Sequence, residues 1–256
     1  MKAPLSVLRE SVAGGPAVDT AVSRLLLDEV ASGVRGECLR LWQPDAALAF
    51  SAIDRTRPGF PNAAAAARAL GFEPFLRLAG GHAAVYAPSL LAFVWTQPAP
   101  NARSGIEARF ADLARRVVAA LVKLGVDARV GEVAGEFCPG DFSVNARGRV
   151  KLMGVGQRVV RGAAHVGGVL LVREAAAVRD VLVTVYAALD LDLDPASFGS
   201  VEGECGETQL SNVADALLQQ FERDRGLAFE NLGTDLLQQA HAAADRYRVG
   251  SSLPQN

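Results

Sequence analysis

A single lysine, Lys151, lies among apolar residues and glycines in the run GRVKLMGVGQR, residues 148–158. An ammonium group in such a place can bind a carboxylate, an acyl carbonyl or a phosphate through charge-assisted hydrogen bonds. Gly154 and Gly156 follow at alternate positions, and glycines inside a strand indicate the close approach of a ligand or of another backbone. The alternative is a lysine on an open sheet face whose charged end stays in water, and the spacing alone does not decide between the two.

Three cysteines, Cys38, Cys138 and Cys205, lie far apart, with no CxxC pair and no spacing that suits a zinc site. We therefore expect reduced thiols. A free cysteine is usually a small buried residue, and this interpretation suits Cys38 and Cys205. Cys138, in GEFCPGDFS, lies instead among glycines and a proline in a predicted loop, where a side chain packs poorly.

Nucleotide-binding motifs are incomplete or missing. The pair Gly154 and Gly156 forms a GxG, but the third glycine of GxGxxG is absent and a strand, not a helix, is predicted to follow. No P-loop pattern occurs in the sequence.

The composition is that of an ordinary globular protein. The 256 residues are 50% hydrophobic and 21% charged, and 26 basic and 28 acidic residues give a formal net charge of -2. Without a basic block, nucleic acid is not expected as a partner. The N-terminal residues do not resemble a signal peptide and no segment is long and apolar enough to span a bilayer, so we expect a cytoplasmic protein without a membrane partner.

The first half of the chain predicts both helices and strands, which are grouped in runs and do not strictly alternate. A helix is expected from the helical spacing of apolar residues between Val18 and Val30, with Gly33 at its end. CLRLWQP, AALAFSAIDR, FEPFLRLAGGHAAVYAP and SLLAFVWTQP predict strands, and PNAAAAARALG predicts a short helix. Ser104 and Glu107 predict a capping box that opens a long helix ending at Gly125.

From Asp127 to Arg173, a pattern that repeats every two residues predicts an antiparallel meander of strands, and helices are predicted after it. Such grouped elements indicate an α+β fold in which helices flank a mixed, largely antiparallel sheet. We expect an N-terminal arm over residues 1–16 and a single domain over 17–256, with a helical C-terminal part over 174–256. His241 lies in the last predicted helix and is expected at the surface.

Three segments together resemble the lipoate-protein ligases and octanoyltransferases of the biotin/lipoate protein ligase superfamily. RLAGGHAAVY is similar to their Arg-x-x-Gly-Gly-Gly-Ala-Val-x-His motif, and LRLWQPDAALAFS is similar to a segment upstream of it. KLMGVGQRVVRGAAHVGGVLLV resembles their Lys-x-x-Gly-x-x-Gln-Arg run and the strand after it. The resemblance implies the fold of the biotin/lipoate protein ligase catalytic domain.

The resemblance also implies residues of a binding site. Arg77, Gly80 and Gly81 would form a loop over the acyl or nucleotide group, with His82 in place of the usual third glycine and Tyr86 in place of a histidine. Lys151 would contact the acyl carbonyl or the phosphate of an acyl-adenylate. The remaining substrate-binding residues implied by the resemblance are Gly154, Gly156, Gln157 and His165.

Two residues distinguish the branches of this family. Cys138 precedes Lys151 by a distance similar to that in one class of octanoyltransferase, in which the thiolate takes the acyl group as a thioester; a nearby ammonium favours the thiolate form. In the ATP-dependent ligases an acidic residue near this loop holds magnesium, a role that Asp141 would take, although an aspartate after glycine is also an ordinary turn residue.

The expected activity is transfer of an octanoyl or lipoyl group to a lysine of a lipoyl carrier domain or of a glycine-cleavage H-type protein, with acyl carrier protein as a further donor. The transferase would need no cofactor, whereas the ligase would need ATP and magnesium. A relative that binds an acyl group or a carrier protein without turnover is the third hypothesis, because His82 and Tyr86 depart from the family motif.

Overall fold

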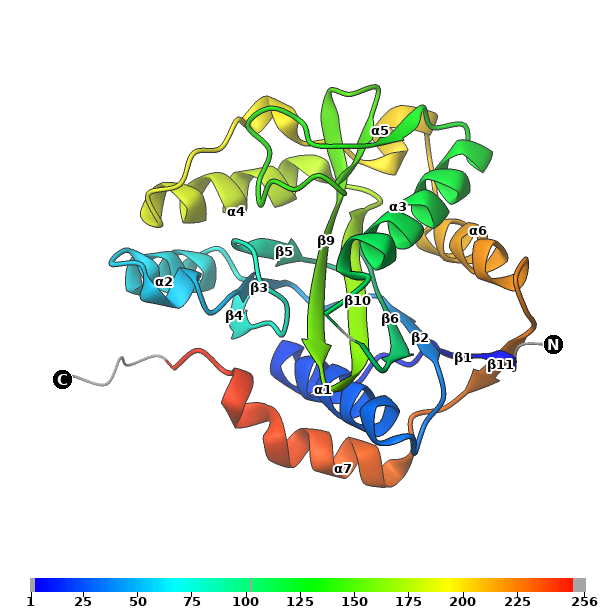
Figure 1. Ribbon diagram of the computed structural model, residues 1–256. Helices are drawn as coiled ribbons and strands as arrows, with labels where there is room; N and C mark the ends of the chain where they lie inside the picture. Colours follow the sequence, from blue (N-terminus) through cyan, green and yellow to red (C-terminus); the bar gives the residue numbers. More distant parts are fainter. Residues whose placement is uncertain (1–2, 102, 251–256) are drawn as a thin grey trace.

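A computed structural model describes residues 3–101 and 103–250 (Figure 1). Within this part of the chain, eight strands form one sheet in the order β11-β1-β2-β6-β10-β9-β8-β7. Strands β11, β1 and β2 are parallel, and from β2 to β7 each pair of neighbours is antiparallel. The strand bounds are β1 Leu5–Leu8, β2 Cys38–Trp42, β6 Leu90–Ala99, β7 Ala128–Val130, β8 Val144–Ala146, β9 Val150–Val160, β10 Gly162–Leu171 and β11 Leu227–Glu230.

A second, smaller sheet lies beside the first. It joins β3, Ala47–Phe50, to β4, Glu73–Leu76, in parallel and to β5, Ala84–Tyr86, in antiparallel register. The stretch FEPFLRLAGGHAAVYAP therefore forms two strands of this sheet, and the loop between them, residues 77–83, carries the glycine pair.

Helices cover the sheets in three groups (Figure 1). Helices α3 and α6 pack with the large sheet around one apolar core, α1 and α7 pack together around a second, and α2 and α4 enclose a third beside the small sheet. The helix bounds are α1 Pro16–Ser32, α2 Phe60–Ala69, α3 Ile106–Lys123, α4 Ala175–Ala188, α5 Val201–Cys205, α6 Leu210–Glu222 and α7 Thr234–Ala243, with 3-10 turns η1 Asp54–Thr56, η2 Pro195–Ser197 and η3 Ala244–Tyr247.

The predicted α+β class, the first helix and the meander are confirmed. Helix α1 ends at Gly33, whose left-handed backbone, with φ 79°, suits glycine. The predicted capping box is wrong: α3 begins after Gly105, and the Ser104 hydroxyl donates to the carbonyl of Asn101 instead, at 2.8 Å.

Both ends of the chain differ from expectation. Leu5–Leu8, predicted to belong to an arm, form β1 inside the sheet, between β2 and β11. Strand β11 lies in the part predicted to be helical. Short strands such as these carry too little alternation to be recognised before their partners are known.

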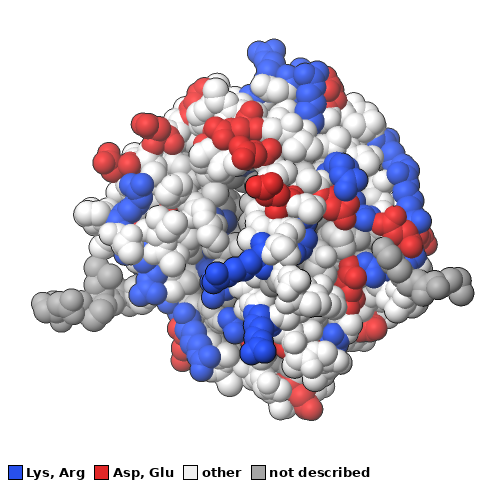
Figure 2. All heavy atoms as spheres, in the orientation of Figure 1, with Lys and Arg blue, Asp and Glu red and all other residues white. Residues whose placement is uncertain are grey.

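On the face shown in Figure 2, a group of Asp and Glu side chains lies just above a central hollow and Lys and Arg side chains lie just below it, while both signs occur together around the edge. None of the helices that the structure describes has the length and hydropathy of a membrane span.

Candidate active site

Lys151, on β9, is fully buried. Its Nζ atom donates to Glu136 Oε1 at 2.8 Å, to the carbonyl of Phe137 at 2.7 Å and to the carbonyl of Cys138 at 2.9 Å. The interpretation as a solvated lysine on an open face is therefore wrong. An ammonium has three hydrogens, and these three acceptors match them in number, so Lys151 holds the backbone of the loop that carries Cys138.

Glu136 is the charge partner of Lys151 and is itself buried. Its carboxylate also accepts from the Ser143 hydroxyl, at 2.5 Å, and from the backbone N–H of Val133, at 3.0 Å. Burial lowers the pKa of Lys151, and the Glu136 carboxylate opposes that shift. A buried ion pair with its remaining acceptors satisfied fixes geometry, because breaking it leaves an unpaired charge.

Cys138 adopts a strained backbone conformation for a residue other than glycine, with φ 44°. Its N–H donates to the Tyr186 hydroxyl on α4 at 2.8 Å, and that hydroxyl donates to the carbonyl of Ala83 at 3.0 Å. With the Lys151 contact to its carbonyl, both polar groups of the Cys138 peptide are held. Strain that the surroundings enforce is characteristic of functional positions.

The Cys138 sulfur faces hydrogen-bond donors from the loop of residues 77–83. The backbone N–H of His82 donates to Sγ at 3.2 Å, and Arg77 Nη2 lies 3.7 Å from it. The sulfur thus lies between a backbone N–H and a guanidinium group. Cys138 is partly exposed.

Gly81 makes this approach possible. It has φ 89°, and a Cβ atom there would lie 2.6 Å from Cys138 Sγ and 2.9 Å from Arg77 Nη2. The loop can pass the sulfur this closely only without a side chain at that position. Gly80, by contrast, is exposed, and a Cβ on it would meet nothing within 4 Å.

His82 connects the sulfur to a buried carboxylate. Its Nδ1 lies 3.1 Å from Oδ1 of Asp54, a residue of η1 with no exposed surface, while the imidazole side chain is 27% exposed. The second Asp54 oxygen accepts from the backbone N–H of Ser51 at 2.9 Å. Asp54 gave no signal in the sequence, since it lies in an ordinary turn-forming stretch.

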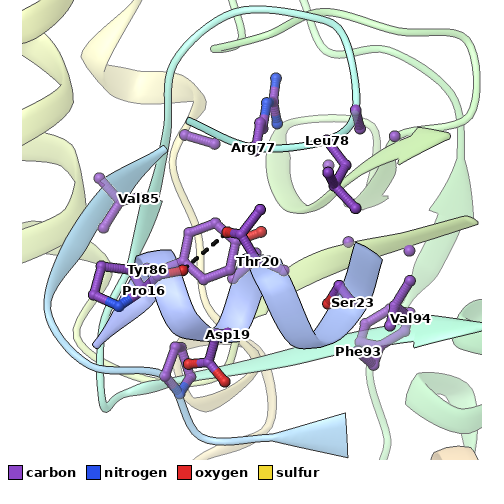
Figure 3. A pocket seen from close by; sticks show the side chains of 18 of the residues that line it. Pro16, Asp19, Thr20, Ser23, Arg77, Leu78, Val85, Tyr86, Phe93 and Val94 are labelled. Atoms are coloured by element: carbon purple, nitrogen blue, oxygen red, sulfur yellow. Dashed lines mark hydrogen bonds between the residues drawn. The ribbon is translucent and has the colours of Figure 1, made fainter. Parts of the chain in front are cut away.

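An apolar pocket extends from Cys138 between the loop of residues 77–83, the large sheet and α1 (Figure 3). Arg77 and Leu78 lie on the loop, opposite Asp19, Thr20 and Ser23 of α1. Its apolar walls include Phe75, Val85, Phe93, Val94, Val169 and Leu171. A cavity of this character suits an acyl chain whose carbonyl end lies at the sulfur.

Polar groups also line the pocket, chiefly on the α1 side. Thr20 donates to the carbonyl of Pro16 (Figure 3). The buried Trp42 indole N–H has no partner among the described residues. His165, predicted at the pocket wall, does line it, and its Nδ1 lies 2.9 Å from Thr96 Oγ1. Burial lowers the pKa of His165 to about 3, so the ring is neutral at pH 7.

The two glycines of β9, Gly154 and Gly156, have different neighbours. Gly154 lies beside Lys151, and a Cβ on it would be 3.4 Å from the lysine Cε. Gly156 lies against the loop, because a Cβ there would come within 2.8 Å of the Ala79 Cβ. Both residues line the pocket.

Six of the predicted site residues are not in the pocket lining: Lys151, Gly80, Gly81, His82, Gln157 and Asp141. Gln157 accepts from Arg109 Nε at 2.6 Å and donates to the carbonyl of Ile106, so it ties β9 to the start of α3. Asp141 is exposed on the loop after Cys138. In the described part of the chain, no three His, Cys, Asp or Glu residues are grouped as a metal site made of protein ligands alone would need. A role of Asp141 in holding magnesium beside phosphates stays a prediction.

Sequence comparisons identify related proteins. The family model described as lipoyl protein ligase A/B catalytic domain matches residues 15–222. An octanoyl-[GcvH]:protein N-octanoyltransferase of Geobacillus kaustophilus is 27% identical over 179 residues, which are 68% of this chain and 63% of that protein. A protein of the same name from Exiguobacterium sibiricum is 30% identical over 64% of this chain and 59% of its own length. The match thus spans less than two thirds of these relatives.

Solved structures share the fold. A lipoate-protein ligase A bound with ATP has a TM-score of 0.78 at 18% identity, over 95% of each chain. A bipartite lipoate protein ligase from Thermoplasma acidophilum has a TM-score of 0.75 at 17% identity, over 95% of this chain and 92% of that one. At these identities the likeness concerns the fold alone.

Proposed function

The chain belongs to the lipoyl protein ligase A/B catalytic-domain family, and on that premise we propose that it transfers an octanoyl group between carrier proteins through a thioester on Cys138. The observation that carries the proposal is the position of the Cys138 sulfur, at one end of an apolar pocket and beside the His82 N–H and Arg77. The names of the relatives, which specify octanoyl-[GcvH] and a protein, support a carrier lysine at each end of the reaction.

The reaction would proceed in two balanced steps. The Cys138 thiolate attacks the carbonyl carbon of N-octanoyl-lysine on the donor, a C–S bond forms, and the C–N bond breaks as the lysine nitrogen takes up a proton. A lysine amine of the second carrier then attacks the thioester, loses a proton, and displaces Cys138 as a thiolate. The apolar pocket would hold the octanoyl chain in both steps.

Lys151 would act as a positioning residue. Sequence comparison with the family implies a contact with the acyl carbonyl, but its ammonium donates to Glu136 and to the carbonyls of Phe137 and Cys138. We therefore assign it the task of fixing the Cys138 backbone. Burial and these three bonds leave it poorly placed to move a proton.

Intact mass spectrometry of the enzyme and of an apo lipoyl domain tests the proposal. The enzyme is incubated with octanoyl-GcvH without ATP, and in parallel with lipoate, ATP and magnesium. We expect an octanoyl mass on both proteins with octanoyl-GcvH, and loss of both in Cys138→Ala. A product that forms only with lipoate and ATP and survives Cys138→Ala would instead establish a ligase. No product under either condition, with octanoate still bound, would indicate a binding protein.

A further inference from the structure

His82 is held from three directions at the Cys138 sulfur. Its N–H donates to Sγ, its carbonyl accepts from Arg77 Nη2 at 2.6 Å, and its Nδ1 faces the buried carboxylate of Asp54. Because Asp54 can only accept while ionised, it selects the imidazole form with a proton on Nδ1. Nε2 is then the ring nitrogen able to exchange a proton with a reactant.

The proposed reaction, on which this inference rests, has an unusual proton requirement. An octanoyl group on a lysine is an amide, and an amine leaves an amide only when its nitrogen is protonated. The second step is the reverse of the first, so the attacking amine must lose a proton in the same place. A thioester donor has no such need, because a thiolate leaves without a proton.

Other groups near the site are poorly suited to this task. Lys151 is buried and bonded to three acceptors, and Tyr186 is bonded to Cys138 and Ala83. The chain has three histidines: His165 is buried against Thr96, and His241 lies in α7. His82 is therefore the histidine whose backbone N–H bonds to the reacting sulfur and whose partly exposed imidazole is paired with Asp54.

We propose that His82, oriented by Asp54, donates a proton to the leaving lysine nitrogen when Cys138 is acylated by an amide and accepts the proton of the attacking amine when Cys138 is released. The same Nε2 serves both directions, so the imidazole begins and ends one turnover in the same state. Asp54 is a positioning residue that acts through His82.

Charged and titratable groups meet His82 from each neighbouring element. Asp54 approaches from η1, Arg77 from the same loop, Cys138 from the loop before β8, and Tyr186 of α4 bonds to that loop. Lys151 and Glu136 lie behind Cys138 as a paired unit. Of these, histidine is the type whose charge changes between about pH 5 and 8.

A comparison of two octanoyl donors distinguishes a role of His82 in proton transfer from a purely structural role. Purified wild type and His82→Gln are mixed with octanoyl-GcvH, an amide, or with S-octanoyl-N-acetylcysteamine, a thioester, and the octanoyl mass on Cys138 is followed with time. We expect His82→Gln to slow labelling by the amide on the order of 100-fold, the effect of losing a general acid, and to leave labelling by the thioester unchanged.

Further variants keep the test decisive. Asp54→Asn should act like His82→Gln, because an amide that accepts from Ser51 N–H turns its NH₂ toward Nδ1 and favours the wrong tautomer. Added imidazole should restore the amide reaction of His82→Ala, and His241→Gln serves as the matched control. Equal slowing with both donors, or an unchanged amide reaction, would overturn the inference. A wild type that neither donor labels would instead overturn the proposed function.

Discussion

Residue by residue, the site depends on the close fit of Gly81 to the cysteine. We expect Gly81→Ala to slow the alkylation of Cys138 and to reduce octanoyl transfer on the order of 100-fold. The reason is that the added Cβ atom would lie 2.6 Å from Cys138 Sγ and would displace the N–H of His82. Gly80→Ala is the matched control and should retain activity, since its Cβ meets nothing within 4 Å. Iodoacetamide labelling read by mass checks both variants; equal losses in the two would contradict the fit.

The burial of His165 leads to a prediction about the pH dependence of the unfolding free energy. Its pKa is lowered to about 3 in the folded protein, against about 6.5 in an unfolded chain. Between these values the unfolded chain binds a proton that the folded protein does not, so stability falls as the pH drops below about 6.5. From pH 7 to pH 5 this group should remove about 2 kcal/mol of unfolding free energy.

Urea unfolding of wild type and His165→Gln at both pH values measures the effect. The variant should lose less stability between pH 7 and 5, by about 2 kcal/mol, because the other titrating groups are common to both proteins. Parallel losses in the two proteins would show that His165 is protonated in the fold.

At the scale of elements, β9 and the loop of residues 77–83 are packed together through Gly156. We expect Gly156→Ala to reduce octanoyl transfer while changing the unfolding free energy by only about 1 kcal/mol, because its Cβ would meet the Ala79 Cβ at 2.8 Å and push the loop aside. The double variant Ala79→Gly/Gly156→Ala removes the clash and should recover activity. Losses that simply add would show that the loop does not respond to this contact.

The elements also explain what the sequence could predict. The meander, α1 and α3 follow from local periodicity and turn glycines. Residue type and family resemblance predict Cys138, Lys151 and Arg77 as site residues, and the structure brings these three together. The Asp54–His82 contact joins η1 to the loop of residues 77–83, and α2 and β4 lie between them in the sequence. The contact depends on tertiary packing, so local sequence patterns could not predict it. Gln157 was predicted in the site because of its motif, but its side chain faces the start of α3.

For the molecule as a whole, the two ends of the chain complete the fold around the site. The family match covers residues 15–222, whereas β1, β11 and α7 lie outside it. Strand β11 pairs with β1 along four residues, and α7 packs on α1. Since α1 forms one wall of the pocket, segments outside the family match support that wall.

A substitution of Leu236, which lies outside the pocket lining, tests whether α7 supports α1. It is 5% exposed in α7 and shares the apolar cluster of Val18, Val22 and Leu26 on α1. Leu236→Ala should lower the unfolding free energy by about 2–5 kcal/mol, as expected for a buried leucine, and octanoyl transfer should fail at a lower temperature. Phe229→Ala on β11, where the residue is 62% exposed, should keep the unfolding free energy within about 0.5 kcal/mol of the wild-type value. Urea unfolding and activity after brief heating measure both; a Leu236→Ala protein as stable as wild type would show that α7 adds nothing to the support of α1.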